Sequence, residues 1–532
     1  MNPTPPKQAL VRPALPPGHA PVRVSTLLQH NPGAWPVHDS AGSRALDMLA
    51  AQPLPPHMLM QRAGLSVARL AMALAPNARR IDVLAGTGNN GGDGHEAAMH
   101  LHLAGREVML HTIGSNAAWP PDAAASRQQA RMAGVPTSEG LDPVSLSRTD
   151  LVIDALLGRG LTRPASGVTA EAIRLLRRHP APVLAVDLPS GLPGDTGALE
   201  IGAPCVRAHW TLALLTLAPG LFTANGRDQA GEVWWDDLGV HLLHPGAPAP
   251  AAWLHCPAWV DTVWPGRHHA QHKGSFGDVR VLGGAPSMVG AALLAARTAL
   301  HVGAGRVHVH LLDPAAPRFD PLQPELMFAG APDIGALQTA TVVAGCGGGQ
   351  AIREELPKAL LHAARLVLDA DALNAVAEEP ALRDGLRQRR GRDQPTVLTP
   401  HPLEAARLLG CSAAEIQSDR LRAVRALADQ TGAVVVLKGS GTVVASPGSV
   451  PWLNTSGNAA LATPGSGDVL AGWIGGFWSQ LVGATKGKPP ASVWSSAELA
   501  SRHAVDQHGR RADLLSPTGA PLVASRLVPT AG

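Results

Sequence analysis

Short apolar runs of strand length alternate along this 532-residue chain with stretches whose apolar residues recur every three or four positions, as on one face of a helix. In the first half, the pattern predicts strands at residues 80–85, 107–112, 150–154 and 182–187, and helices at residues 95–104, 122–134 and 170–178. Strands separated by helices of this length form a parallel sheet with helices on both faces. We therefore expect an α/β unit.

The alternation restarts after residue 270 and predicts a second α/β unit. The expected strands are at residues 306–312, 340–344, 364–369, 396–401, 433–437 and 442–445, and the expected helices at residues 288–302, 419–430 and 469–478. Polar and glycine-rich segments again follow the strands. Two domains also agree with a length that is too great for one ordinary domain.

The composition changes at the ends of these units. Residues 1–35 are rich in proline and aperiodic, which is typical of a disordered tail. A Pro/Ala/Gly-rich stretch at residues 246–268 is typical of a linker. We therefore place the first domain at residues 36–245, beginning with apolar residues at helical spacing between positions 35 and 74, and the second domain at residues 269–528.

Charge and composition exclude several classes of protein. The net charge of +3, from 44 basic and 41 acidic residues, provides no general basic surface for nucleic acid. The longest uncharged apolar run, residues 210–222, is too short to span a bilayer, and the N-terminal residues lack the apolar core of a secretory signal. The four cysteines lie far apart, and His268, His269 and His272 have no carboxylate or cysteine companions, so neither disulfides nor zinc are expected. We expect a cytoplasmic enzyme that binds neither nucleic acid nor membrane.

Polar side chains gather after three strands of the first half. They are Asn89, Asn90 and Asp93 after one strand, Asp154 at the end of another, and Asp187 and Ser190 after a third. In an open α/β sheet the ligand binds beyond the carboxyl ends of the strands, so these residues should converge on one pocket. Any single aspartate could instead be a turn or cap residue, but three strand ends together favour a site.

The loop after residue 85 nominally matches GxGxxG through Gly86, Gly88 and Gly91. The dinucleotide fingerprint also requires an acidic residue at the end of the second strand, where this chain has residues 111–114, His-Thr-Ile-Gly. The motif therefore does not favour an NAD-dependent dehydrogenase, and the amides and carboxylate of the loop favour coordination or acid–base chemistry.

In the second half, residues 463–472 organise the candidate chemistry. Gly465, Ser466 and Gly467 precede Asp468, directly before an apolar run that predicts a helix. Small residues before a helix leave backbone N–H groups free to bind phosphate, and an aspartate there can take a proton beside a phosphoryl group. An ordinary glycine-rich turn with an aspartate cap is the alternative.

Two further segments of the second half carry candidate chemistry. Residues 438–442, Lys-Gly-Ser-Gly-Thr, place a cation, flexible backbone and a hydroxyl at a strand end, which suits nucleotide phosphates. His401 lies between Pro400 and Pro402, which restrict the backbone around it. The chain lacks GxxxxGKS and GxxxxGKT, so it is not a P-loop NTPase. A surface lysine and a loop histidine with a structural hydrogen bond are the alternatives.

Taken in order, these segments resemble the bifunctional NAD(P)H-hydrate repair enzymes over residues 40–525. The first half is similar to an NAD(P)H-hydrate epimerase domain and the second to an ADP-dependent (S)-NAD(P)H-hydrate dehydratase. The motifs are residues 59–64 (LMQRAG), 88–94 (GNNGGDG), 154–161 (DALLGRGL), 187–191 (DLPSG), 272–277 (HKGSFG), 368–374 (LDADALN), 398–401 (LTPH), 438–442 (KGSGT) and 465–468 (GSGD). The resemblance implies a Rossmann-like three-layer α/β/α domain followed by a ribokinase-like α/β domain.

For the first half, the resemblance implies interconversion of (R)- and (S)-NAD(P)H hydrate. A potassium ion would be held by Asn90, Asp154 and Ser190. The pocket for the hydrated nicotinamide would be lined by Asn89, Asn90, Gly91, Gly92, Asp93, Gly158, Arg159, Gly160, Leu161, Thr162, Arg163, Pro164 and Asp187. Either Asp187 or Asp93 would move the proton, and the sequence leaves both open.

For the second half, the resemblance implies dehydration of the S form to NAD(P)H with ADP as co-substrate, Mg²⁺ as cofactor, and AMP and phosphate as products. Substrate contacts would be made by Ala291, Gly347, His401 and Asp468, with Asp468 as the base. Nucleotide contacts would be made by Lys438, Gly439, Ser440, Gly441, Thr442 and Gly467. The expected partners are NADHX, NADPHX and ADP, and we expect a homo-oligomer.

The chain departs from the family pattern at Cys346, where proline is usual, and at Leu403, where glycine is usual. Both lie near expected ligand contacts, so we expect them to change affinity more than activity. The ribokinase-like plan leaves a second enzyme class open, a small-molecule kinase acting on a hydroxymethyl-pyrimidine- or thiazole-like alcohol. A non-enzymatic scaffold role for the first half is the third alternative, although its strand-end polar residues are all present.

Overall fold

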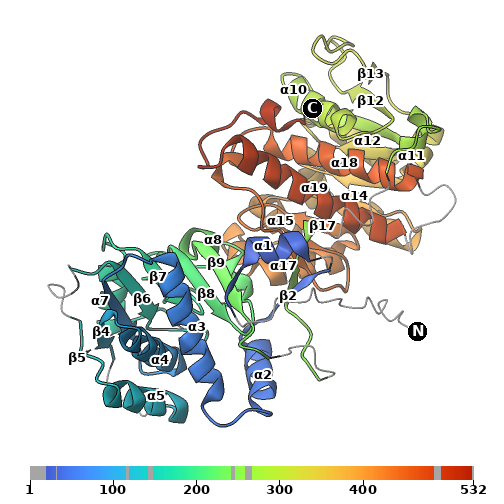
Figure 1. The fold of residues 1–532 in the computed structure, drawn as a ribbon. Coiled ribbons are helices and arrows are strands. Elements are labelled where there is room, and N and C mark those ends of the chain that lie inside the picture. The colour runs from blue at the N-terminus through green and yellow to red at the C-terminus, as the bar shows by residue number, and fades with distance from the viewer. Residues whose placement is uncertain are drawn as a thin grey trace. The chain divides into compact units, whose positions relative to one another are not determined.

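The computed structural model describes residues 20–31, 33–114, 119–141, 146, 148–161, 163–240, 246–257, 266–484 and 493–529. It consists of two compact units, Met1–Cys256 and Pro257–Gly532 (Figure 1). The division falls inside the stretch 246–268, of which residues 258–265 lie outside the described residues. Both units are α/β, as the sequence predicts. No helix in the described part of the chain has the length and apolar content needed to cross a membrane.

The first unit is built on a sheet with the strand order β1-β9-β8-β7-β6-β3-β4-β5. Neighbours from β5 to β9 are parallel, and β1 pairs antiparallel with β9. From β3 the chain adds strands toward β5, and from β6 it adds strands in the opposite direction, toward β9. Rossmann-like sheets reverse in the same way, and ligands bind at the point of reversal. The strands of this sheet are β1 (Val22–Arg23), β3 (Arg80–Ala85), β4 (Glu107–Thr112), β5 (Thr137–Glu139), β6 (Leu151–Ala155), β7 (Val183–Val186), β8 (Trp210–Leu214) and β9 (Glu232–Asp236). The unit also contains β2 (Trp35–Val37) and β10 (Ala252–Leu254), which pair antiparallel with each other.

Helices cover both faces of this sheet, because its strands are apolar on both sides. Leu101 of α4 packs with Val83 of β3 in one core, and Ile173 of α7 packs with Leu84 of the same strand in another. Neighbouring residues of a strand point to opposite faces, so the two cores lie on opposite sides. The helices are α1 (Val24–His30), α2 (Ser40–Ala51), α3 (Met58–Leu74), α4 (Asn89–Leu103), α5 (Pro121–Met132), α7 (Gly167–Leu176), α8 (Gly226–Gln229) and the 3-10 turn η1 (Pro219–Leu221).

Two predictions for this unit are wrong. Residues 20–31 belong to the predicted disordered tail, but they include β1 and α1. Val24, Leu27 and Leu28 lie on one face of α1 and are buried, which offsets the entropy of ordering this short segment. Residues 1–19 of the predicted tail lie outside the described residues. In addition, α4 begins at Asn89 rather than at residue 95, so the predicted loop is largely a glycine-rich first turn of a helix.

The second unit has its own sheet, in the order β13-β12-β11-β14-β15-β16-β17-β18-β19. Neighbours from β13 to β17 are parallel, and β18 and β19 continue antiparallel. The strands are β11 (Asp278–Gly283), β12 (Arg306–Leu311), β13 (Met327–Phe328), β14 (Thr341–Ala344), β15 (Arg365–Leu368), β16 (Thr396–Leu398), β17 (Val434–Leu437), β18 (Val443–Ala445) and β19 (Trp452–Leu453). The winding reverses between β11 and β14, which places the expected ligand site beside them.

Helices α10, α18 and α19 share one core with this sheet, in which Ala295, Ile474 and Ala500 pack with Val281 and Val343. The predicted helix at 469–478 is longer, because α18 begins at Ser466 and ends at Ala484. The helical elements are η2 (Lys273–Phe276), α10 (Val289–His301), α11 (Ile334–Thr339), α12 (Ile352–His362), α13 (Asp371–Glu378), α14 (Pro380–Gly391), α15 (Pro402–Leu409), α16 (Ala413–Ser418), α17 (Arg420–Thr431), η3 (Ala459–Leu461), α18 (Ser466–Ala484), α19 (Val493–Leu515) and η4 (Ala524–Leu527).

A buried guanidinium ties α14 to the sheet. Arg389 is 1% exposed and donates hydrogen bonds to Thr396 Oγ1 at 2.7 Å and to the carbonyl oxygens of Leu360 and Ala363, both at 2.8 Å. We expect Arg389→Met to lower the free energy of unfolding of this unit by about 2–4 kcal/mol, because several buried acceptors lose their donor. Urea unfolding measures the change, with the more exposed Arg387→Met as the control. Equal midpoints for the two variants would contradict this account.

Candidate active sites

The carboxyl ends of β3, β6 and β7 face a cavity of about 1160 Å³ in the first unit. Cavities of this order bind small molecules and cofactors. Ten of the predicted substrate contacts lie on its wall: Asn89, Asn90, Asp93, Gly158, Arg159, Gly160, Leu161, Arg163, Pro164 and Asp187. The prediction for Thr162 falls on a residue outside the described part of the chain.

Gly91 and Gly92 are not among the residues that line this wall, and their role in substrate binding stays a prediction. Both are buried in the first turn of α4. A Cβ at Gly91 would lie 1.8 Å from the carbonyl oxygen of Gly86, and one at Gly92 would lie 2.5 Å from the sulfur of Met60. These glycines allow α4 to approach its neighbours closely, which brings Asn90 and Asp93 to the cavity.

Asp187 and Arg159 form an ion pair on the cavity wall. The Nε of Arg159 lies 3.2 Å from both carboxylate oxygens of Asp187, and its Nη2 donates to the carbonyl oxygen of Thr216. Asp187 has a φ of +62°, in the left-handed region that few residues other than glycine, asparagine and aspartate adopt. Strained backbone of this kind clusters at functional sites. The backbone and the ion pair therefore fix the direction of this carboxylate.

Asp93 lines the same cavity as Asp187, in surroundings that disfavour a negative charge on its carboxyl group. Burial, together with the negative charges of Asp187, Asp47 and Glu96, raises the pKa of Asp93 well above its usual value. At the cavity mouth, enclosure by the walls and the charge of Asp187 raise the pKa of Asp47 to about 6. Two carboxyl groups in contrasting environments are the usual arrangement for an acid and a base. The raised pKa favours the protonated form of Asp93, which shares the cavity with the ion-paired Asp187.

Asp154 and Ser190 form a buried pair behind this wall. The Ser190 hydroxyl donates to Asp154 Oδ1 at 2.6 Å, and the Ser190 amide donates to Oδ2 at 2.8 Å. Burial raises the pKa of Asp154 to about 6 despite these bonds. The amide nitrogen of Asn90 is buried with no partner among the described residues, and Asn90 packs against Gly158, one residue from the Leu157 amide that donates to Ser190. The side-chain oxygens of Asn90, Asp154 and Ser190 are ligands of the kind that bind a cation.

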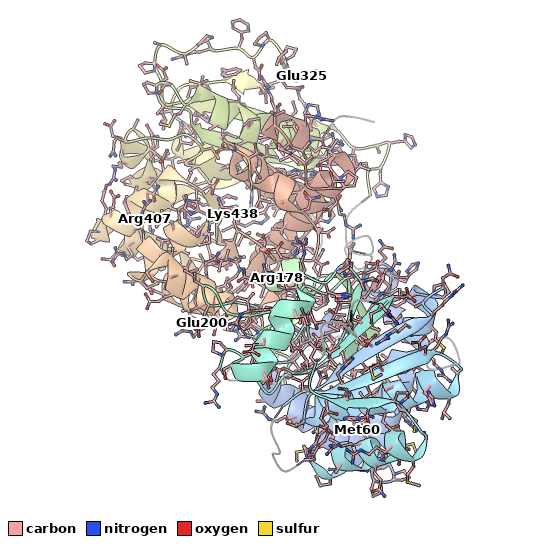
Figure 2. The ribbon with its side chains drawn as sticks, turned by 90° about the vertical axis from the view of Figure 1, so that its left-hand side faces the viewer. Met60, Arg178, Glu200, Glu325, Arg407 and Lys438 are labelled. Atoms are coloured by element: carbon pink, nitrogen blue, oxygen red, sulfur yellow. The ribbon has the colours of Figure 1, made fainter. Side chains whose placement is uncertain are left out.

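In the second unit, a buried carboxylate, a lysine and a hydroxyl meet at the ends of three parallel strands. Asp369 follows β15 and accepts hydrogen bonds from Lys438 Nζ and Thr399 Oγ1, both at 2.7 Å. Lys438 follows β17 (Figure 2), and its Nζ also lies 4.0 Å from Glu404. Burial would lower the pKa of Lys438, but the charges of Asp369 and Glu404 outweigh burial and raise it. The lysine therefore stays cationic while largely shielded from water.

Asp468 lies in the first turn of α18 and belongs to the same cluster. One potential ligand atom from each of Cys346, Asp369 and Asp468 lies within 4.8 Å of the others. Burial and the negative charge of Asp369 raise the pKa of Asp468 to about 6, although a hydrogen bond from the Cys346 thiol opposes this shift. Burial and the two aspartates raise the pKa of Cys346 well above its usual value, so the thiol stays protonated.

Small residues surround this cluster and leave space beside it. A Cβ at Gly467 would lie 3.2 Å from Lys438 Nζ. Gly465 has a φ of +87° and directly precedes α18, where free backbone N–H groups begin. Gly347 has a φ of +58°, and a Cβ there would lie 2.9 Å from that of Ala291. The predicted contacts Gly347 and Ala291 are therefore adjacent, as are Gly467 and Lys438.

His401 has a structural role in addition to its predicted one. It is the N-cap of α15, and its Nδ1 accepts hydrogen bonds from the amides of Leu403 and Glu404. Its Nε2 lies 3.3 Å from Glu404 Oε1, and the side chain is 46% exposed. Burial raises the pKa of Glu404 to about 7. The alternative interpretation of His401, a histidine with a structural hydrogen bond, therefore holds for Nδ1. Nε2 faces the cluster.

Several residues of these sites do not follow from the sequence reasoning. Asp369 carried a usable signal, because it ends a strand as Asp154 and Asp187 do. Glu404 gave no such signal, because the sequence shows it only as the glutamate of a capping box that begins at His401. Many other residues of the cavity wall were missed, and those with titratable side chains include Arg44, Asp47 and His57.

Comparisons with known proteins agree with this division. A family model described as NAD(P)H-hydrate dehydratase matches residues 279–518, and one described as YjeF-related protein N-terminus matches residues 56–220. The bifunctional NAD(P)H-hydrate repair enzyme of Escherichia coli (strain K12) is 36% identical over 430 residues, covering 79% of this chain and 80% of the relative. That of Coxiella burnetii is 33% identical over 476 residues, covering 88% and 94%. A solved ADP/ATP-dependent NAD(P)H-hydrate dehydratase from Bacillus subtilis aligns with a TM-score of 0.43 and 29% identity, over 52% of this chain and 94% of that one.

The fold and the two clusters define a two-domain α/β enzyme with a separate polar site in each unit. Both family models match in the same order, and relatives above 30% identity are covered over most of their length. The chain belongs to the family of bifunctional NAD(P)H-hydrate repair enzymes. The resemblance and the fold classes expected from the motifs are thereby confirmed.

Proposed function

We propose that the first unit interconverts (R)- and (S)-NAD(P)H hydrate and that the second dehydrates the S form to NAD(P)H, with ADP as phosphoryl donor. The observation that carries this proposal is the placement of Asp468, on the first turn of α18, beside Asp369 and Lys438. This arrangement supplies a base, a cation and free backbone N–H groups at one place, which are the needs of phosphoryl transfer. Family membership supports the same pair of activities.

In the first unit, epimerisation at C6 requires either opening of the nicotinamide ring or loss and return of water, and the paired carboxyl groups suit the second route. The C6–O bond breaks as the hydroxyl leaves with a proton, and water then adds back while giving up a proton. Asp93 is suited to protonate the leaving hydroxyl, because its pKa is raised, and Asp187 to accept the proton from the returning water. A potassium ion would be held by Asn90, Asp154 and Ser190, where its charge would offset the buried carboxylate.

In the second unit, hydroxide is a poor leaving group, so dehydration begins by phosphorylating it. Asp468 takes the proton from the C6 hydroxyl, whose oxygen attacks the β-phosphorus of ADP and releases AMP. The C6–O bond then breaks, phosphate departs, and loss of a proton from the neighbouring ring carbon restores the C=C bond. The backbone N–H groups of Gly465 and Gly467 and the Lys438 ammonium would stabilise the charge of the transferring group. Mg²⁺ would be held by Asp369, whose carboxylate is a typical ligand, and would neutralise phosphate charge.

The direct test follows absorbance at 340 nm after adding the protein to a mixture of R and S hydrates. With ADP, we expect recovery of NADH or NADPH from both epimers, since the first unit feeds the second. Parallel reactions contain ATP with hydroxymethyl-pyrimidine and thiazole alcohols. Phosphorylation of those alcohols without any recovery of NAD(P)H would refute the proposal and favour the small-molecule kinase.

The proposed potassium site predicts that K⁺ changes both the rate of epimerisation and the Tm of the first unit. Replacing K⁺ by tetramethylammonium should slow epimerisation and lower the Tm of the first unit, because the cation offsets the cost of ionising buried Asp154. Asp154→Asn should abolish the effect of K⁺ on the Tm. The control is Asp150→Asn, an exposed carboxylate that accepts from the amides of Arg79 and Arg80 at the opposite end of the same strand. A K⁺ effect of the same size in all three proteins would locate the ion elsewhere.

A further inference from the structure

The turn that follows β17 wraps around a second fully buried guanidinium. Arg420, the first residue of α17, is 1% exposed. Its Nη2 donates to the carbonyl oxygens of Leu437 and Lys438, both at 3.1 Å, and of Gly441 at 3.4 Å. Its Nη1 donates to Gln417 Oε1 at 2.6 Å. One side chain thus holds three carbonyl oxygens of a five-residue turn.

This arrangement sets the direction of the amides in the turn. A carbonyl and the N–H of the following residue point in opposite directions across a planar trans peptide. Because the carbonyls of Lys438 and Gly441 face the guanidinium, the amides of Gly439 and Thr442 face away from it. Neither amide donates to a protein acceptor within the parts of the chain that the structure describes. Backbone amides that point outward from one turn make an anion-binding concavity.

Gly439 leaves the space in this turn that the guanidinium of Arg420 requires. Gly439 has a φ of +131°, and a Cβ there would lie 3.0 Å from Arg420 Nη1 and 3.2 Å from Nη2. Any larger residue would have to displace the arginine or the turn. Gly439 and Arg420 therefore shape the turn together, although they lie 19 residues apart in the sequence.

We infer that Arg420 is a positioning residue for the nucleotide: its buried guanidinium holds the turn of residues 437–441 so that the amides of Gly439 and Thr442 point toward the phosphates of ADP. Arg420 itself is buried behind the turn and does not contact the ligand. The inference rests on the proposed function, which places ADP at this turn. It extends the site to a residue that no motif includes.

The test compares Arg420→Met with Arg389→Met, because both variants remove a fully buried guanidinium that donates to carbonyl oxygens of the same unit. The ADP Kd is measured by calorimetry and the KM values for ADP and for the hydrate by the 340 nm assay. We expect Arg420→Met to weaken ADP binding by about tenfold or more, since two amides lose their alignment to a charged group. The KM for the hydrate should change much less. Arg389→Met should lose stability and keep the wild-type ADP Kd.

Gly439→Ala serves as a second variant, because it disturbs the same turn while leaving every charge in place. It should reproduce the loss of ADP affinity even if Arg420→Met folds poorly. Wild-type ADP affinity in folded Arg420→Met or in Gly439→Ala would overturn the inference alone. Equal losses of affinity in Arg420→Met and Arg389→Met would also overturn it, because they would reflect stability. Absence of ADP binding by the wild-type protein would instead overturn the proposed function, and the inference with it.

Discussion

The Asp468→Asn variant should lose ADP-dependent dehydration by a factor of about 10³, the usual scale for removing a general base, and should interconvert the R and S hydrates at the wild-type rate. Asparagine keeps the size and the helix-start position of Asp468 but cannot take the proton of the C6 hydroxyl. Epimerisation is untouched because the first unit has its own carboxylates, Asp93 and Asp187. Dehydration is followed at 340 nm and interconversion by chromatographic separation of the epimers.

The pH dependence gives an independent check on Asp468. Because burial and Asp369 raise its pKa to about 6, wild-type dehydration should fall as the pH drops through about 6, where the carboxylate takes up a proton. A carboxyl group whose pKa is higher in the folded than in the unfolded state costs stability at pH values above the folded pKa. Above pH 6, Asp468→Asn should therefore have a higher Tm than the wild type.

The control for this variant is Asp278→Asn, which removes a carboxylate paired with Arg306 at the start of β11. It should keep both activities. If Asp468→Asn also lost interconversion while remaining folded by circular dichroism, the two activities would share one site and the two-site proposal would be wrong.

The Asp187→Asn variant should do the reverse, with interconversion reduced by about 10² to 10⁴, as expected for loss of a proton acceptor, and with dehydration of the pure S hydrate unchanged. Asparagine tolerates the left-handed backbone of this position, so the fold should be kept. In the mixed-hydrate assay, recovery of NAD(P)H should stop when the S form is exhausted. The remaining R form would then convert only at its spontaneous rate.

Asp93→Asn separates the roles of the two carboxyl groups. If Asp93 is the proton donor, its loss should lower the rate by the largest factor at low pH, where the wild-type carboxyl group carries its proton, and by a smaller factor as the pH rises. Asp187→Asn, which removes the proton acceptor instead, should give a different pH profile. Identical pH profiles for the two variants would therefore reject the assignment of acid and base.

The parallel strands and their polar ends were predictable because two signals coincide there. A buried parallel strand is an uninterrupted apolar run, and a carboxylate directly after it, as at Asp154 or Asp187, stands out against that background. The glycine-rich start of α4 had no such contrast. Glycine lowers helix propensity, so residues 89–94 read as a loop, although close packing against Gly86 and Met60 holds them in a helix.

Contacts between distant residues were not predictable from one sequence. The hydrogen bond of the Cys346 thiol to Asp468 joins positions more than a hundred residues apart, and Cys346 was visible only as a departure from a family pattern. Arg420 read as an ordinary helix residue, and only the path of the chain brings it under the turn after β17. Short α1 was missed because three apolar residues in a proline-rich context give too little periodicity.

The left-handed backbone at Asp187 also bears on how natural variants of this position should be understood. Alanine would remove the carboxylate and strain the chain at once, whereas asparagine or glycine would remove only the carboxylate. A lineage that abandons epimerisation while keeping the domain for binding is therefore expected to pass through asparagine or glycine here. Such a substitution in a genome would mark the loss of catalysis with the fold retained, and alanine or valine would mark decay of the domain itself.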